Sequence, residues 1–261
     1  MAGELIVKRD GAVGTIVFDN VDKHNAVSYD MWRALPDAVR TLDGDPEIRV
    51  IVVTGAGEKA FVSGADIAEF RAQRNAESAR RDYNAAVEAG YLALSSTDTP
   101  TIARIRGVCY GGGMGLAIAC DMRIAAEDSR FSLPAARLGL GYSFAGIKRL
   151  VAVVGPANAA EIIATARTYN AAEALEIRLV NRVVPPALLD STVADHAAAI
   201  AANAPLTVRA AMRAIDESLK SPGERDLVAL EALIEACFAS DDYREGREAF
   251  MQKRPPKFRG R

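Results

Sequence analysis

Histidine and cysteine are scarce in this chain, which has two histidines and three cysteines among 261 residues. Cys109, Cys120 and Cys237 have neither a paired nor a metal-ligand spacing, and each lies in an apolar run. No cluster of metal-binding residue types accompanies them in the sequence. We therefore expect buried thiols in a reducing cytoplasm, without a metal centre.

Long apolar runs and excess charge are also lacking. No window approaches the roughly 18 apolar residues that would span a membrane, and Met1–Leu5 lacks the basic and apolar regions of a signal peptide. The formal net charge is -2, so nothing indicates a nucleic-acid surface or an acidic tail. These features predict a soluble cytoplasmic protein with neither nucleic-acid nor membrane partners. Phosphates of a ligand would have to be bound by local groups.

A glycine cluster is the most informative feature that the chain does contain. A predicted strand at Ile102–Val108 precedes Gly111, Gly112 and Gly113, and an apolar, helix-like run follows them. The start of such a helix has free backbone N–H groups, and the helix dipole favours negative charge there. The pattern therefore predicts an oxyanion site. The alternative interpretation is that the glycines only allow a tight turn and close helix packing.

Alternating strand-like and helix-like segments predict the fold. Leu5–Val7 and Thr15–Phe18 are β-rich runs around a glycine turn, as in a hairpin. Ser28–Leu42 has apolar residues at helical spacing, and Val50–Val53 is typical of a strand buried on both faces. We expect a layered α/β fold with right-handed crossovers.

The last third of the chain is predicted to be mainly helical. Helix-like sequence begins at Pro156 and is interrupted by a predicted strand at Leu179–Val184. The alanine-rich end is typical of a helical oligomerisation element. Its predicted helices are Leu188–Ala202, Leu206–Leu219 and Glu224–Ala239.

Several motifs in one order resemble the enoyl-CoA hydratase/isomerase (crotonase) family, and the match runs nearly end to end. The motifs are Ala60–Phe70, Gly107–Asp121, Leu138-Gly139, Ala172–Leu175 before Leu179, and Asp241–Phe250. The resemblance implies a spiral of ββα units and a helical trimerisation region. We expect residues 1–200 to form the spiral core with the CoA-thioester site and residues 201–261 to form the helical oligomerisation region.

The resemblance also implies an acyl-CoA thioester substrate and an enolate intermediate held by two backbone N–H groups. In this chain those donors are Ala65 and Gly112. Small residues fit this role, because a larger side chain would obstruct the approach of the thioester carbonyl to the main chain. No cofactor is expected beyond the CoA part of the substrate. A homotrimer or a dimer of trimers is the implied assembly.

CoA contacts are predicted on the same basis. His24 and Ala26 match the segment that lines the CoA path, and Lys23 is a candidate phosphate contact. Asp66 and Ile67, which follow Ala65, are predicted CoA contacts as well. Lys253 matches a lysine that reaches the CoA phosphates from a neighbouring subunit. Each lysine could equally be a solvated surface residue.

The chain departs from hydratases at two positions. Gly115 and Ala135 stand where hydratases have the two glutamates that deliver water. Neither residue transfers a proton, and a general acid–base group contributes about 10² to 10⁴ in rate. Glu127 and Asp128 do not replace the pair, because they fall in a predicted turn after the next strand. These departures argue against efficient hydration.

A decarboxylase-type lyase reaction fits a site without glutamates, because it needs an enolate-stabilising site but no water-activating base. Arg137–Ile147 resembles the corresponding stretch of methylmalonyl-CoA decarboxylases in the family, in which a tyrosine at the position of Tyr142 faces the acyl group. The similarity is partial, because those decarboxylases have a histidine in place of Ala65 and an acidic residue after the glycines. Tyr142 is therefore a catalytic candidate, with a structural role as the alternative.

Other functions remain as alternatives. One is a hydratase or isomerase with a non-standard acid or base, and another is a non-catalytic CoA-thioester binder. A serine hydrolase using Ser143 is disfavoured, since only His24 and His196 could act as its base. The glycines do not complete a dinucleotide-binding spacing, and no phosphate-binding Gly-Lys-Ser/Thr signature is present.

Overall fold

The computed structural model describes residues 3–66 and 77–261. Its main sheet has six strands in the order β1-β2-β3-β5-β7-β10. β1 and β2 form an antiparallel hairpin around Gly11, and the other neighbours are parallel. The strands are β1 (Glu4–Asp10), β2 (Val13–Asp19), β3 (Val50–Gly55), β5 (Thr101–Ile105), β7 (Met122–Ala126) and β10 (Arg182–Val184).

A second sheet has four short strands in the order β4-β6-β8-β9. β4, β6 and β8 are parallel, and β9 pairs antiparallel with β8. These strands are β4 (Ala60–Val62), β6 (Val108–Tyr110), β8 (Arg130–Ser132) and β9 (Tyr169–Asn170). A strand of the first sheet is followed by one of the second and then by a helix, in the series β3-β4-α3, β5-β6-α4 and β7-β8-α5. This repeat confirms the predicted spiral of ββα units.

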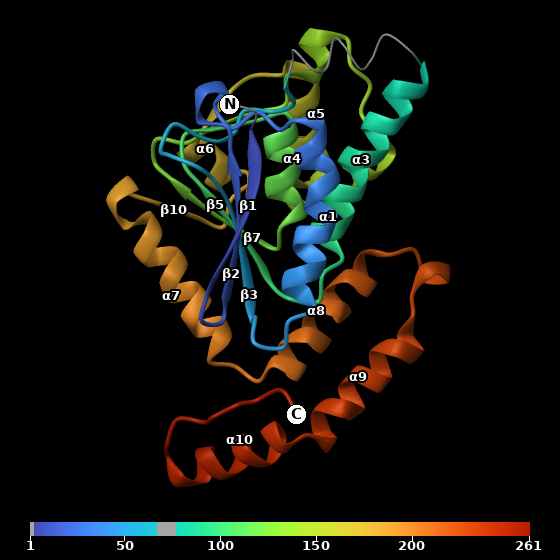
Figure 1. Cartoon of the computed structure of the whole chain (residues 1–261). Helices are drawn as coiled ribbons and strands as arrows, with labels where there is room; N and C mark the ends of the chain where they lie inside the picture. Colours follow the sequence, from blue (N-terminus) through green and yellow to red (C-terminus); the bar gives the residue numbers. More distant parts are fainter. Residues whose placement is uncertain (1–2, 67–76) are drawn as a thin grey trace.

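Helices cover both faces of the main sheet (Figure 1). Alternate residues of β3 point to opposite sides: Ile51 and Val53 join a core with α1, α3 and α4, whereas Val50 and Val52 join a smaller core with α7. The strand is therefore buried on both faces, as its β-branched sequence predicts. The helices of these layers are α1 (Tyr29–Asp43), α3 (Glu77–Ser95), α4 (Gly112–Ala119), α5 (Phe144–Thr165), α6 (Ala171–Glu176) and α7 (Leu189–Ala201).

Three helices form the C-terminal region: α8 (Pro205–Leu219), α9 (Leu227–Ala239) and α10 (Asp241–Gln252). α9 packs against α8 and α10, and α9 and α10 extend away from the sheets (Figure 1). Short 3-10 helices occur at Val21–Lys23, Pro134–Leu138, Pro186–Leu188 and Pro222–Glu224. In the described ranges, no helix combines the length and the apolar character needed to cross a bilayer.

The single strand predicted at Ile102–Val108 is wrong. Gly107 has a φ of 66° and divides the segment into β5 and β6, which belong to different sheets. A Cβ on Gly107 would lie 2.0 Å from the carbonyl oxygen of Lys59, so only glycine fits where the chain crosses. This crossing turns a strand of the main sheet into one that leads to the glycine cluster.

Three other predicted boundaries are also wrong. Helix α5 begins at Phe144, well before Pro156, and Gly155 interrupts it with a φ of 77°. The predicted strand at Leu179–Val184 is reduced to β10, because the N–H groups of Leu179 and Val180 bond to Ala174 O at the end of α6. Helix α9 begins at Leu227, where Asp226 accepts the capping bond from Ala229 N.

Candidate active site

Two backbone N–H groups meet where β4 and β6 end. Gly64 and Ala65 follow β4, and Gly112 begins α4 directly after β6 and Gly111. Ala65 lies in a parallel bridge with Val27, in which Val27 N donates to Gly64 O at 2.8 Å and Asp66 N donates to Val27 O at 3.0 Å. This pairing directs the N–H of Ala65 to the side away from Val27.

The geometry brings these two N–H groups together. A Cβ on Gly112 would lie 3.7 Å from Ala65 N, and a Cβ on Gly64 would lie 3.8 Å from Gly112 N. Gly112 is the first residue of α4, so its N–H has no partner within the helix. In the part of the chain that the structure describes, neither N–H donates to a backbone acceptor. The arrangement suits an oxyanion, which would accept a hydrogen bond from each of the two N–H groups.

Each glycine of the cluster serves a different purpose. Gly111 has a φ of 51°, which fits a left-handed turn, and a Cβ on Gly113 would lie 2.1 Å from Val62 O. The interpretation of the cluster as a tight turn with close packing thus holds for these two positions. A Cβ on Gly112, by contrast, would enter a space bordered by Ala65 N and by the side chains of Trp32 and Tyr91.

Trp32 borders this space with its six-membered ring and carries a buried donor. Its Cζ2 atom would lie 3.2 Å from a Cβ on Gly112, while its Cε3 atom would lie 3.2 Å from a Cβ on Gly90 in α3. The indole is 1% exposed, and its Nε1–H has no hydrogen-bond partner among the described residues. A buried donor of this kind is costly unless a ligand or water accepts from it.

Tyr91 occupies the space beside Gly115, the position predicted to correspond to the first glutamate of hydratases. A Cβ on Gly115 would lie 2.3 Å from the Oη atom of Tyr91, so the phenol takes the volume that a side chain at position 115 needs. The hydroxyl donates to Gly112 O at 3.2 Å. Ala135, at the second glutamate position, is buried in the 3-10 helix Pro134–Leu138. Sequence reasoning missed Tyr91, because its proximity to Gly115 depends on how α3 packs against α4.

Tyr142 precedes α5. Burial raises the pKa of Tyr91, and the nearby Tyr142 raises it further. Desolvation of its own hydroxyl raises the pKa of Tyr142 to about 12, although 40% of the residue's surface is exposed. Both phenols therefore stay protonated at neutral pH.

Ser143 is the N-cap of α5, and its Oγ atom accepts from Gly146 N at 3.1 Å. That cap gives Ser143 a structural role.

The predicted CoA contacts on the first loop lie next to Ala65. Ser63 N donates to His24 O at 3.0 Å, and Asn25 donates to Ala60 O at 2.8 Å. Lys23 Nζ is 2.6 Å from Asp66 Oδ2, so these two predicted contacts form an ion pair with each other. The sequence did not indicate that pairing.

The predicted CoA contacts on this loop differ in how far their side chains are exposed to solvent. His24 is exposed with a φ of 53°, whereas Ala26 and Asp66 are buried. The Lys23 side chain keeps 54% of its surface exposed and lies at the edge of the site. An exposed lysine at such an edge is suited to a phosphate.

The remaining two predicted contacts are not part of this group. Lys253 is exposed at the C-cap of α10, and Figure 1 places α10 at the opposite end of the molecule from α4. Within one chain, the structure does not bring Lys253 to the site. Ile67 lies outside the described residues.

Two of the three cysteines are buried, as the sequence predicts. They are Cys109 and Cys120, and burial raises the pKa of Cys120 to about 12. Cys237 is only partly buried, on α9. His196, on α7, accepts a hydrogen bond from Arg182 Nε at 3.0 Å. No group of three or more metal-binding side chains occurs in residues 3–66 and 77–261.

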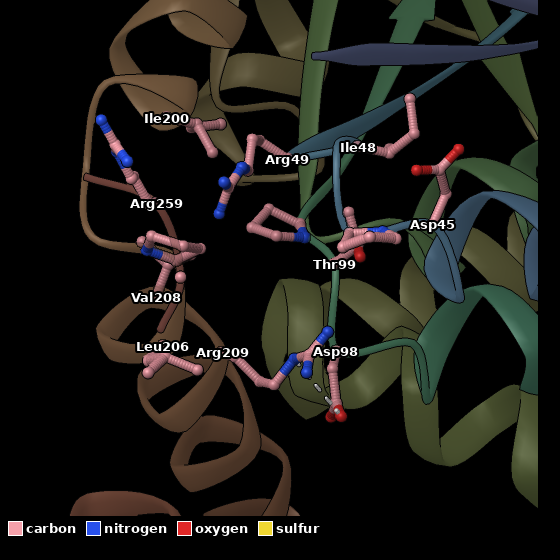
Figure 2. A pocket seen from close by; sticks show the side chains of 14 residues that line it. Asp45, Ile48, Arg49, Asp98, Thr99, Ile200, Leu206, Val208, Arg209 and Arg259 are labelled. Carbon is pink, nitrogen blue, oxygen red and sulfur yellow. Dashed lines mark ion pairs between the residues drawn. The ribbon is translucent and has the colours of Figure 1, made fainter. Parts of the chain in front are cut away.

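A separate cavity of about 110 Å³ lies between the main sheet and α8 (Figure 2). Arg49 and Pro100 line it just before β3 and β5 begin, and Arg209 pairs with Asp98 at 3.9 Å. The paired N–H groups of Ala65 and Gly112 instead follow the carboxyl ends of β4 and β6, which is where ligands of parallel sheets bind. The cavity is therefore distinct from the candidate active site.

Comparison with known proteins places this geometry in a family. Residues 8–261 match the family model described as enoyl-CoA hydratase/isomerase. A crotonyl-CoA hydratase of Syntrophomonas wolfei is 34% identical over 254 residues, which cover 97% of each chain. A carnitinyl-CoA dehydratase of Salmonella enteritidis is 32% identical over 265 residues, which cover 100% of each chain.

A solved structure agrees with the match to the family model. The crystal structure of an enoyl-CoA hydratase from Bacillus anthracis superposes with a TM-score of 0.92 at 33% identity, covering 98% of this chain and 99% of that chain. These relatives are named as hydratases and a dehydratase, so the resemblance to decarboxylases stays a prediction. The chain belongs to the enoyl-CoA hydratase/isomerase family.

Proposed function

We propose that this protein binds an acyl-CoA thioester and stabilises its enolate with the N–H groups of Ala65 and Gly112. The observation that carries this proposal is the convergence of both groups on the space beside Gly112. A developing oxyanion would accept both bonds, and one such donor is worth about 3 kcal/mol in the transition state.

The reaction we propose is of the decarboxylase type, acting on a malonyl-type thioester. Gly115 and Ala135 supply no carboxylate, and Tyr91 takes the volume beside Gly115. The C–C bond to the carboxylate would break, its electrons would form the enolate held by the two N–H groups, and CO₂ would leave. This step needs no activated water.

The unpaired indole N–H of Trp32 supports a substrate with a polar acyl group. Trp32 contacts the same space as the two oxyanion donors, and its Nε1 atom has no acceptor among the described residues. A carboxylate on the acyl chain would accept from it and remove the cost of the buried donor. A purely apolar acyl chain would leave the indole N–H unpaired.

A second candidate is hydration or isomerisation of an enoyl-CoA with a non-standard acid or base. The names of the relatives favour it, since they include a crotonyl-CoA hydratase and a carnitinyl-CoA dehydratase. The phenols of Tyr91 and Tyr142 would then have to replace both glutamates.

The experiment that separates these functions is a panel of acyl-CoA thioesters followed by mass spectrometry. Loss of CO₂ from a malonyl-type thioester supports the decarboxylase proposal, and addition of water to an enoyl thioester supports the second candidate. Binding by calorimetry without any product would identify a non-catalytic CoA-thioester binder and overturn both.

We also propose that the protein assembles as a homotrimer or a dimer of trimers through its C-terminal helices. An apolar groove of about 720 Å³ runs between α8, α9 and α10. Val228, Phe250 and Met251 are more than 80% exposed in this region. Exposed apolar surface of this kind is suited to a contact between copies of the chain. Lys253 would then reach the CoA phosphates of a neighbouring subunit.

A further inference from the structure

Tyr91 is held in a single orientation by three elements. Its ring meets Trp32 of α1 edge to face, with centroids 5.2 Å apart. The guanidinium carbon of Arg149, on α5, lies 5.3 Å from the centroid of the Tyr91 ring, and Arg149 forms an ion pair with Glu88. The hydroxyl donates to Gly112 O. The phenol is thus a fixed part of the site.

The hydroxyl of Tyr91 borders the space in which a thioester carbonyl would bind. The Oη atom would lie 3.6 Å from a Cβ on Gly112, and Ala65 N would lie 3.7 Å from that same point. A thioester oxygen that accepts from Ala65 and Gly112 brings its carbonyl carbon into this space. The α-carbon, one bond further along, is then within reach of the hydroxyl.

We propose that Tyr91 is the catalytic acid of this site and donates a proton to the α-carbon of the bound enolate. This inference rests on the proposed function in one respect: it assumes that an enolate of the acyl-CoA thioester forms in this site. The enolate's electron pair forms the new C–H bond, the O–H bond of Tyr91 breaks, and the C=O bond of the thioester is restored. Water then returns a proton to the phenolate.

The surroundings of Tyr91 keep its hydroxyl protonated until the enolate forms. Burial raises the pKa of Tyr91 well above 10, and Tyr142, Tyr83 and Glu88 raise it further, while Arg149 opposes them. The phenol is therefore a donor at neutral pH. An enolate carbon is a much stronger base than a phenolate, so the proton transfer is downhill. The ring stays fixed, but rotation of the O–H bond about the C–O bond can redirect the proton from Gly112 O to the carbon.

Tyr91→Phe tests this role in D₂O with a malonyl-type thioester that carries an α-methyl group. The unaltered protein should place deuterium on the α-carbon in one configuration. The variant should turn over about 10²-fold more slowly, give both configurations, and keep its CoA-thioester affinity. Tyr243→Phe, on α10, is the matched control and should behave like the unaltered protein. Full turnover with one configuration in Tyr91→Phe would overturn the proposal.

A second assay works even without decarboxylation. Deuterium exchange into the α-carbon of propionyl-CoA runs the same proton transfer in reverse and is followed by mass spectrometry. Exchange should exceed that of the free thioester, increase with pH as phenolate forms, and fall to background in Tyr91→Phe. Tyr91-dependent exchange without decarboxylation would sustain the acid role and reject the proposed reaction. Exchange that does not depend on Tyr91, or none in protein that binds propionyl-CoA, would overturn the acid role.

The packing of Tyr91 against Gly115 has its own test. Gly115→Ala puts a methyl group 2.3 Å from the present position of Tyr91 Oη, so the phenol must move. We expect a lower Tm and a loss of turnover, with the Tm recovered in the double variant Tyr91→Leu with Gly115→Ala. Gly223→Ala is the control, because nothing lies within 4 Å of its added methyl group. A Gly115→Ala variant with full turnover and a higher Tm would contradict the arrangement.

Discussion

The smallest residues of this site decide what it can bind. Gly112 leaves open the space that Ala65 N and Tyr91 Oη border, and Gly115 leaves room for the Tyr91 phenol. The absence of a side chain at position 112 therefore leaves room for the ligand, whereas its absence at position 115 leaves room for the side chain of Tyr91.

Gly112→Ala should separate binding of the ligand from stability of the fold. The new methyl group would lie 3.2 Å from Trp32, a contact that a small shift relieves, so we expect little change in Tm. It also fills the space of the thioester carbonyl, and we expect turnover to fall by about 10²-fold, as for loss of one oxyanion donor. Steady-state kinetics and thermal unfolding measure both effects. The control is Gly223→Ala, where nothing lies within 4 Å of the added methyl group.

Tyr142→Phe tests whether the second phenol orients the acyl group. Its hydroxyl is desolvated and lies beside Tyr91, so we expect lower turnover of a branched malonyl-type thioester with little change in CoA binding. Calorimetry and product analysis follow the two quantities. Equal turnover of the variant and the unaltered protein would assign Tyr142 a structural role.

At the scale of elements, the repeated ββα unit positions the site. β4 and β6 are parallel neighbours, so the loops that follow them meet at one edge of the second sheet. The crossing at Gly107 makes this possible, because it takes the chain from β5 in the main sheet to β6.

Two carboxylates tie helix α10 to the final segment of the chain: Asp242 accepts from the N–H groups of Arg259 and Gly260, and Glu245 accepts from residues nearer the helix. Glu245 accepts from Arg254 at 2.6 and 2.9 Å and from Lys257 N at 2.8 Å, and these bonds lower the pKa of Glu245 to about 2. A lowered pKa in the folded state stabilises this attachment above the ordinary carboxyl range, and the stabilisation is lost as the pH falls towards 2.

The backbone N–H groups of Arg254 and Lys257 should therefore lose protection against hydrogen exchange between pH 4.5 and 2, with protection measured relative to an unfolded peptide at the same pH. Glu245→Gln should show faster exchange already at neutral pH and a smaller pH dependence in this range. Asp37→Asn is a suitable control, because Asp37 pairs with Arg40 on the exposed face of α1. The same pH dependence in Glu245→Gln and the unaltered protein would show that Glu245 does not hold the segment.

Local patterns in the sequence were enough to predict much of the molecule. The cap at Ser28, the buried strand β3 and the glycine cluster each depend on neighbours in the chain, and the order of motifs indicated the spiral and its family. Tyr91 could not be predicted, because its contact with Gly115 spans 24 positions and arises only when α3 packs on α4. The ion pair of Lys23 with Asp66 could not be predicted either, because it joins two loops that are far apart in the sequence.

At the scale of the whole molecule, the apolar groove of the C-terminal helices predicts association. Sedimentation at micromolar concentration should give three or six times the mass of the chain. Phe250→Asp, which places a charge on an 83% exposed aromatic residue, should shift the protein towards smaller species. Val7→Asp, on the exposed edge strand β1, is the control. A monomer at this concentration would contradict the assembly and the role of Lys253.

The central claim is that this site stabilises an enolate without activating water through glutamates. Its most direct test compares crotonyl-CoA hydration, followed by the loss of conjugated absorbance, with CO₂ release from a malonyl-type thioester in the same preparation. We predict CO₂ release with very weak hydration, because Gly115 and Ala135 transfer no protons. Hydration at ordinary hydratase rates would contradict the claim.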